Sequence, residues 1–222
     1  MSQKVEQALE RLIHVLPLKE NQAKLGPEIK RLHQDILSAF VETGQIMSKA
    51  QIMEKIKAGG QPASYDAIKT LLENNDMVVF SENGEPVGAY PFTSEKREHK
   101  VLINGHQVYA MCALDALSVS PMFGKPAKVV SRCRVTNEPV NVEMDGKQIL
   151  NMDAAGGLYF GILWAAANTC ACCADSLCME MMFLKNKTTA ENWLEADPAN
   201  REIFTLKEAV DFGARFFVPL ME

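Results

Sequence analysis

The chain has 222 residues, a formal net charge of −5, and hydrophobic and charged fractions of 47% and 23%. These values are typical of a globular protein with one large or two small domains. The acidic balance argues against nucleic acid or an anionic membrane surface as the main partner, and no apolar run approaches the ~18 residues of a membrane span. The polar N-terminus has no signal-peptide pattern, so we expect a cytoplasmic protein. Thiols stay reduced in that compartment, so the six cysteines are candidate ligands, nucleophiles or core residues rather than disulfides.

Residues 1–94 are predicted to form an N-terminal helical, winged-helix-like domain. Apolar periodicity, prolines, glycines and serine caps predict helices over 3–16, 27–44, 48–59 and from Ser64, then extended runs over 77–80 and 86–90. Helices followed by a β-hairpin invite a DNA-binding hypothesis. The would-be recognition helix carries Asp66, Lys69 and Glu73, without the excess positive charge that phosphates require. We therefore expect a packing domain that covers the site of its neighbour.

Residues 95–222 are predicted to form a second domain of antiparallel or mixed β-sheet with flanking helices, so the fold class is α+β. Asn104-Gly105 is typical of a hairpin turn. The predicted elements are strands over 100–103, 106–110, 127–135, 140–143, 158–164 and 179–184, a short helix after Cys112, a loop over 121–126, and C-terminal helices with capping boxes at Thr188/Glu191 and Thr205/Glu208. Alternation along the strand over 179–184 predicts that Cys178 and Glu180 share one face.

Cys112 and Asp115 form a candidate reaction centre. Cys112 is expected at a strand-to-helix junction, where the helix dipole favours a thiolate. Asp115 lies three residues on, so in a helix the two side chains share a face. A polarised thiol and a carboxylic acid would then occupy one small volume. The alternative is a buried cysteine beside an acid that only complements the first helical turn.

These features together resemble the organomercurial (alkylmercury) lyase family over about residues 26–217. The resemblance rests on Cys112-Ala113-Leu114-Asp115, the 127–139 segment with Cys133, the strand bearing Cys178, and the C-terminal segments 188–193 and 208–213. It implies a winged-helix-like domain that is not a repressor, joined to a catalytic domain built on antiparallel sheet. It also implies a catalytic set of Cys112, Cys178 and Asp115, with Cys133 in a structural role.

The resemblance implies protonolysis of a carbon–mercury bond in an organomercurial substrate. A second soft thiolate adds electron density to the metal, the carbon becomes carbanion-like, and a nearby acid must protonate it. Asp115 can hold that proton because burial and a neighbouring thiolate both raise a carboxyl pKa. A hydrocarbon leaves, and Hg²⁺ stays as bound product on Cys112 and Cys178, with Asp115 as a candidate further ligand. No organic cofactor is required, and the expected partners are cellular thiols and mercuric reductase as the Hg²⁺ acceptor.

The sequence departs from the family pattern around both catalytic cysteines. Met111 and Met179 stand where the family often has Trp and Cys, which changes the expected pocket shape. The extra cysteines Cys170, Cys172 and Cys173 lie in a small, polar segment that is predicted to be a mobile loop. With Cys178 they could form a closed thiolate site for Zn²⁺ or Cu⁺; we favour accessory thiols that capture or hand on mercury. Two alternatives for the whole protein are a non-catalytic soft-metal-binding protein derived from the lyase fold and a metal-responsive regulator, which the charge of the winged helix disfavours.

Overall fold

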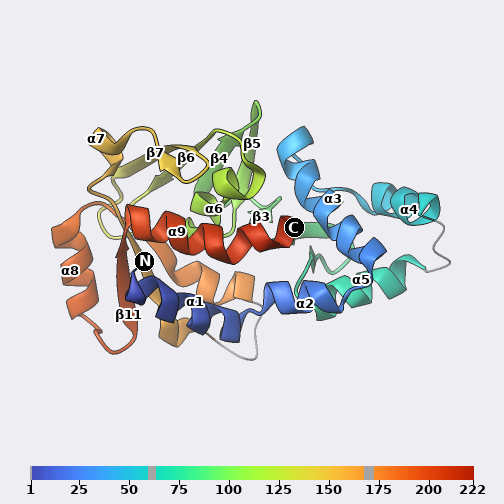
Figure 1. Ribbon diagram of the computed structural model, residues 1–222, viewed down its shortest axis with the longest axis horizontal. Helices are drawn as coiled ribbons and strands as arrows, with labels where there is room; N and C mark the ends of the chain where they lie inside the picture. The colour runs from blue at the N-terminus through green and yellow to red at the C-terminus, as the bar shows by residue number, and fades with distance from the viewer. Residues whose placement is uncertain (1, 60–63, 168–172) are drawn as a thin grey trace.

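The computed structural model describes residues 2–59, 64–167 and 173–222. The architecture is α+β, with N-terminal helices followed by an antiparallel sheet and its flanking helices (Figure 1). The N-terminal helices are α1 (Gln3–Val15), α2 (Leu18–Lys24), α3 (Pro27–Thr43), α4 (Lys49–Ala58) and α5 (Tyr65–Asn74). Sequence analysis did not find α2, because seven residues are too few to show a full apolar period.

The ends of these helices follow the capping signals in the sequence. Pro27 begins α3, and Gly44 ends it with a φ of 76°, a left-handed conformation that glycine adopts without strain. The side chains of Ser48 and Ser64 accept hydrogen bonds from backbone N–H groups in the first turns of α4 and α5. The predicted helices therefore begin and end close to where the sequence places them.

Among the described residues, eight strands form one antiparallel sheet in the order β1-β2-β3-β5-β4-β6-β7-β8. These strands are β1 (Val79–Phe80), β2 (Pro86–Ala89), β3 (Phe92–Thr93), β4 (His99–Ile103), β5 (His106–Ala110), β6 (Ala127–Arg132), β7 (Pro139–Asp145) and β8 (Gln148–Ile149). The β1–β2 hairpin follows α5 as a wing would, and the winged-helix assignment stays a prediction. Because β3 pairs with both β2 and β5, the sheet continues across residue 94. The division into domains at that residue also stays a prediction.

A smaller antiparallel sheet, of three strands within the described ranges, has the order β10-β9-β11. Its strands are β9 (Tyr159–Leu163), β10 (Met181–Leu184) and β11 (Arg201–Thr205), and the remaining helices are α6 (Ala113–Phe123), α7 (Met152–Ala155), α8 (Lys187–Glu195) and α9 (Leu206–Phe217). Short 3₁₀ helices are η1 (Trp164–Ala166), η2 (Cys173–Asp175), η3 (Leu177–Glu180) and η4 (Val218–Met221). The two sheets meet at a parallel bridge between Cys133 and Phe183.

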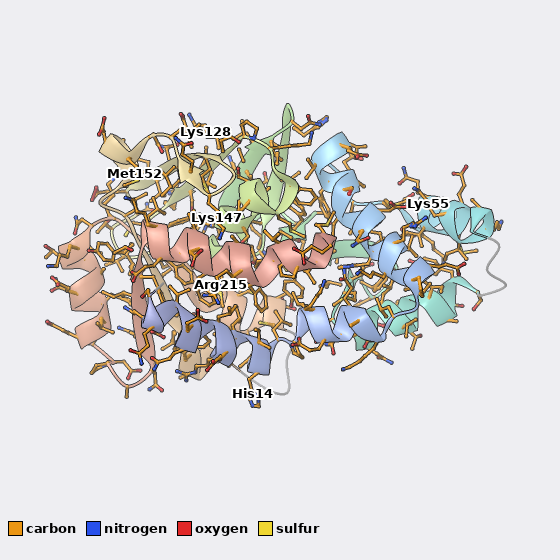
Figure 2. The ribbon with its side chains drawn as sticks, viewed as in Figure 1. His14, Lys55, Lys128, Lys147, Met152 and Arg215 are labelled. Carbon is orange, nitrogen blue, oxygen red and sulfur yellow. The ribbon has the colours of Figure 1, made fainter. Side chains whose placement is uncertain are left out.

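Helix α6 lies at the centre of the core, between the large sheet and α9, and α1 runs along the other side of α9 (Figure 1). Nearly every residue of α6 is buried, including the polar Asp115, Ser118 and Ser120, so the helix is surrounded by the core on all sides. A glycine in α9, Gly213, allows close approach to α6, since a Cβ there would collide with the hydroxyl of Ser118. On the α1 side, Arg215 donates to Glu6 over 2.8 Å (Figure 2). The N-terminal helix α1 thus packs against α9, which in turn packs against α6.

Two predicted boundaries were wrong. The loop expected over 121–126 begins later, because α6 continues through Pro121 to Phe123; a proline in the last turn removes only one intrahelical hydrogen bond. The capping box expected at Thr188 is replaced by Asn186, whose side chain accepts from the backbone N–H of Thr189 over 2.9 Å. Asparagine is as good an N-cap as threonine, so the upstream residue sets the start of α8. The capping box of Thr205 and Glu208 is present as predicted.

Candidate active site

Cys112 lies where the large sheet ends and the central helix begins. Its backbone is extended, with φ −146° and ψ 180°, and it is the N-cap of α6. Its Sγ accepts a hydrogen bond from the backbone N–H of Asp115 over 3.3 Å, the role that a serine or aspartate oxygen usually has. The strand-to-helix junction predicted from the sequence is therefore present, and it aims the thiol into the core.

Asp115 is a buried acid in the first turn of α6, with 1% of its surface exposed. Its Oδ2 has no hydrogen-bond partner among the described residues. Burial raises the pKa of this carboxyl to about 7, because the charged form loses its hydration. Asp115 can therefore hold a proton near neutral pH, which an exposed aspartate cannot do.

Cys178 completes a buried cluster with these two residues. Potential ligand atoms of Cys112, Asp115 and Cys178 all lie within 4.8 Å of one another. The sequence placed Cys178 on a strand, and this was wrong: it belongs to the 3₁₀ helix η3, and β10 begins only at Met181. Glu180 therefore does not share a strand face with Cys178; it is half-buried at the end of η3. The 3₁₀ turn explains the difference, because a period of three residues replaces the alternation of a strand.

Both thiols are held in their neutral form. Burial raises the pKa of Cys112 to about 12, and the nearby Asp115 carboxyl adds to the effect. The hydrogen bonds that Cys178 makes with the sulfurs of Cys112 and Cys173, together with burial, raise its pKa well above the ordinary value. The expectation of a thiolate favoured by the helix dipole was wrong, because desolvation outweighs a dipole effect of at most ~2 kcal/mol. The resting site therefore stores protons on sulfur.

The sulfur of Met181 is part of the surroundings of Cys112, since the Cys112 thiol donates to Met181 Sδ over 3.5 Å. The sequence gives no signal for this contact, because periodicity predicts only that Met181 lies in a buried strand. Sulfur is polarisable and weakly polar. Besides the backbone N–H of Asp115, the buried thiol therefore has a soft sulfur atom among its neighbours.

Cys133 lies apart from this cluster, at the junction of the two sheets. It is buried, it bridges to Phe183, and its backbone N–H donates to the carbonyl of Glu138 over 2.8 Å. Its Sγ accepts from the backbone N–H of Thr136 over 3.4 Å. These contacts hold the β6–β7 turn against β10, which is the geometry of a structural cysteine.

Two of the accessory cysteines, Cys170 and Cys172, lie outside the described residues. Cys173 is described, and for this residue the expected mobile loop was wrong: it is buried in η2. Its Sγ lies 3.8 Å from Sγ of Cys178. The hydroxyl of Tyr90 accepts from the backbone N–H of Ala174 over 2.8 Å. This contact between distant parts of the chain explains the order of η2 and has no signature in the sequence.

Comparisons with known proteins identify the family of this chain. The family model described as alkylmercury lyase matches residues 92–218, more than half of the chain. An alkylmercury lyase of Bacillus cereus is 22% identical over 205 residues, covering 92% of this chain and 89% of that protein. One from Pseudomonas putida is 25% identical over 155 residues, covering 70% of this chain and 71% of that protein.

The fold is also similar to that of a solved structure. The crystal structure of the mercury-bound form of MerB2 superimposes with a TM-score of 0.72 at 19% identity, covering 100% of both chains. None of the described helices is both long and apolar enough to span a bilayer. The family match, the curated relatives and the shared fold lead to one conclusion. The chain belongs to the alkylmercury lyase family and is a lyase that acts on carbon–mercury bonds.

Proposed function

We propose that this enzyme cleaves the carbon–mercury bond by protonolysis, with Cys112 and Cys178 as mercury ligands and Asp115 as the acid. One observation carries the proposal: two buried thiols and a buried carboxyl, one of whose oxygens lacks a described hydrogen-bond partner, have ligand atoms within 4.8 Å. Soft sulfur ligands suit mercury, and the carboxyl suits a carbon that must be protonated. The sequence resemblance assigned the same three residues.

The first step is thiol exchange. An organomercurial enters bound to a carrier thiol, R–Hg–SR′, and one of the two site thiols replaces that carrier on the metal. The proton of the site thiol leaves with the carrier as R′SH. Because burial and hydrogen bonding keep both thiols neutral, this proton is already in the site and no external acid is needed.

The second step breaks the carbon–mercury bond. The remaining site thiol binds the metal, its electron pair enriches the carbon, and the Asp115 carboxyl gives its proton to that carbon as R–H leaves. The proton of this second thiol then returns to Asp115. Cys112 and Cys178 are left as two thiolates on Hg²⁺, and the carboxyl is again protonated. The two thiol protons of the resting site thus account for R′SH and R–H, and no organic cofactor takes part.

The product must leave by ligand exchange, because Hg²⁺ binds thiolates too tightly to dissociate alone. Two cellular thiols, or the thiols of a mercuric reductase, are the acceptors that fit this chemistry. They return two protons to the site sulfurs and carry the metal away. The site is then ready for another substrate.

Methylmercury turnover by the purified protein tests the proposal. With a small thiol present, we expect methane in the headspace, and in D₂O each methane carries one deuterium because the transferred proton comes from exchangeable thiol and carboxyl groups. The matched control is Asp115→Asn, which keeps the shape of the side chain without the acid. Methylmercury that stays bound to the wild-type protein without methane would contradict protonolysis and favour the soft-metal-binding alternative.

A further inference from the structure

The sulfurs of Cys112, Cys178 and Cys173 form a row that leads out of the core. Cys178 is a hydrogen-bonding neighbour of both other thiols, and its Sγ lies 3.8 Å from Sγ of Cys173. The exposed fraction rises along the row, from 1% at Cys112 to 4% at Cys178 and 8% at Cys173. Cys173 is therefore the least deeply buried residue of the three.

Cys173 is not part of the cluster that we propose as the cleavage site. The set of ligand atoms that lie within 4.8 Å of one another contains Cys112, Asp115 and Cys178, and Cys173 is not in it. Cys178 thus has neighbours of two kinds: it belongs to the cluster with Cys112 and Asp115, and its sulfur also contacts that of Cys173. A metal held by Cys178 can reach either thiol without leaving that sulfur.

A small cavity is lined by neighbours of Cys112 and Cys173 in the chain, but by none of the three cysteines themselves. Its volume is about 40 Å³, and its lining includes Met111, which precedes Cys112, and Ala174, which follows Cys173. The lining also includes Arg97 and Asp175, which form an exposed ion pair of 3.4 Å. Surface ion pairs of this kind contribute little stability, so they are a weak barrier to an incoming thiol.

We propose that Cys173 is the exit ligand for the product metal, an assignment that rests on the proposed protonolysis. In this step Cys112–S–Hg–S–Cys178 and Cys173–SH become Cys112–SH and Cys178–S–Hg–S–Cys173. The bond between mercury and Cys173 forms and the bond to Cys112 breaks. The thiol proton of Cys173 passes to the sulfur of Cys112. Mercury stays divalent, so no oxidant or reductant is required.

Transfer of mercury to Cys173 gives cellular thiols access to the bound metal. Exchange between thiolates requires the attacking sulfur to reach the metal, and the described residues around Cys112 leave it almost no exposed surface. After the transfer, mercury lies between the two more exposed sulfurs. Cys112 is protonated again and lies beside Asp115, which is the state that the next substrate needs.

The test measures release of mercury and cleavage of the carbon–mercury bond separately. It compares wild type with Cys173→Ser and Cys173→Ala. Protein loaded with one equivalent of HgCl₂ is mixed with glutathione, and transfer of mercury to the small thiol is timed. We expect transfer to be at least about tenfold slower in both variants, since the sulfur that would exchange is missing. Methane formed in a single turnover of methylmercury should be unchanged. Two variants are used because alanine avoids placing a hydroxyl in a buried site.

Asp175→Asn is the matched control, because it alters the same 3₁₀ turn and removes no sulfur. It should release mercury no more slowly than wild type, because it removes only the weak ion pair with Arg97. Equal transfer rates in wild type and both Cys173 variants overturn the exit assignment, and so does loss of the single turnover when Cys173 is replaced. Direct loading with HgCl₂ keeps the result independent of cleavage: a wild-type protein that transfers mercury through Cys173 but forms no methane refutes the proposed protonolysis alone.

Discussion

The backbone N–H of Asp115 donates to Sγ of Cys112 over 3.3 Å, so the thiol that we propose as a mercury ligand is also the cap of the helix that carries Asp115. A thiolate is a better acceptor than a thiol. Metal binding at Cys112 therefore preserves this cap. The sulfur has two separable roles, one in the helix and one in the proposed chemistry.

Cys112→Ser should separate these roles. A serine oxygen can cap α6 but is a poor ligand for a soft metal, so we expect near-normal thermal stability and no methane from methylmercury. Cys112→Ala should also lose the cap and be less stable by about 1 kcal/mol, measured by urea unfolding. Cys178→Ala should also abolish turnover. Near-normal turnover in any of these variants contradicts a two-thiol site.

Asp115→Asn should bind the substrate and fail to release hydrocarbon. The amide keeps the backbone cap of Cys112 and the volume of the side chain, but it has no proton to give to carbon. Mass spectrometry of the intact protein should find the organomercurial still bound while the headspace contains no hydrocarbon. Wild-type rates in this variant would move the acid role to another residue.

The burial of Asp115 also predicts how stability depends on pH. Its folded pKa, about 7, lies above the ordinary value of 3.8 for an aspartate, so the folded state binds the proton more tightly than the unfolded chain. This contribution is fully present below about pH 4 and is lost as the pH rises through 7. The full effect is on the order of 4 kcal/mol.

Chemical unfolding of the mercury-free protein at a series of pH values tests this prediction. The difference in unfolding free energy between wild type and Asp115→Asn should fall across pH 4 to 8, in the sense that wild type becomes relatively less stable. Other titrating groups are common to both proteins and cancel in the difference. A difference that is independent of pH would show that Asp115 is ionised when folded.

Cys133→Ala should lower stability without changing the chemistry. The side chain is buried where β6 and the turn after it meet β10, and a truncation there costs about 1–3 kcal/mol. Any folded protein should still release methane in a single turnover. Full stability together with lost activity would mean that Cys133 belongs to the site.

Gly213→Ala should destabilise the core by forcing α9 away from α6. The new Cβ would collide with the hydroxyl of Ser118 and come within 3.2 Å of the carbonyl of Leu114, a misfit that typically costs 1–3 kcal/mol. Gly157→Ala is the control, since nothing described lies within 4 Å of a Cβ at that position. Thermal unfolding of the two variants gives the comparison, and equal melting temperatures would refute this account of the helix crossing.

Local signals in the sequence predicted much of the fold. Asn104 and Gly105, for example, form their turn with φ angles of 52° and 80°, the positive values that a two-residue hairpin requires. The three-residue spacing of Cys112 and Asp115 also predicted, from the sequence alone, that their side chains share one face of a helix. Such features depend on a few neighbouring residues, and the sequence displays them directly.

The rest of the site depends on contacts between distant parts of the chain. No spacing rule connects Cys178 with Cys112, and the family resemblance alone brought them together. The ionisation of Cys112 was predicted wrongly, because the depth of burial outweighs the helix dipole and cannot be read from nearby residues. The polar composition around Cys173 suggested exposure, whereas the contact between Tyr90 and Ala174 holds η2 in the core.

The continuous sheet has a consequence for how this protein can be divided. The family match begins at Phe92, the first residue of β3, and β3 covers the outer edge of β5. A fragment that starts at residue 95 would lose β3 and uncover that edge next to α6. Exposed strand edges recruit strands from other molecules, so such a fragment would tend to aggregate. Removing residues 1–94 would therefore yield an aggregating product rather than a smaller enzyme.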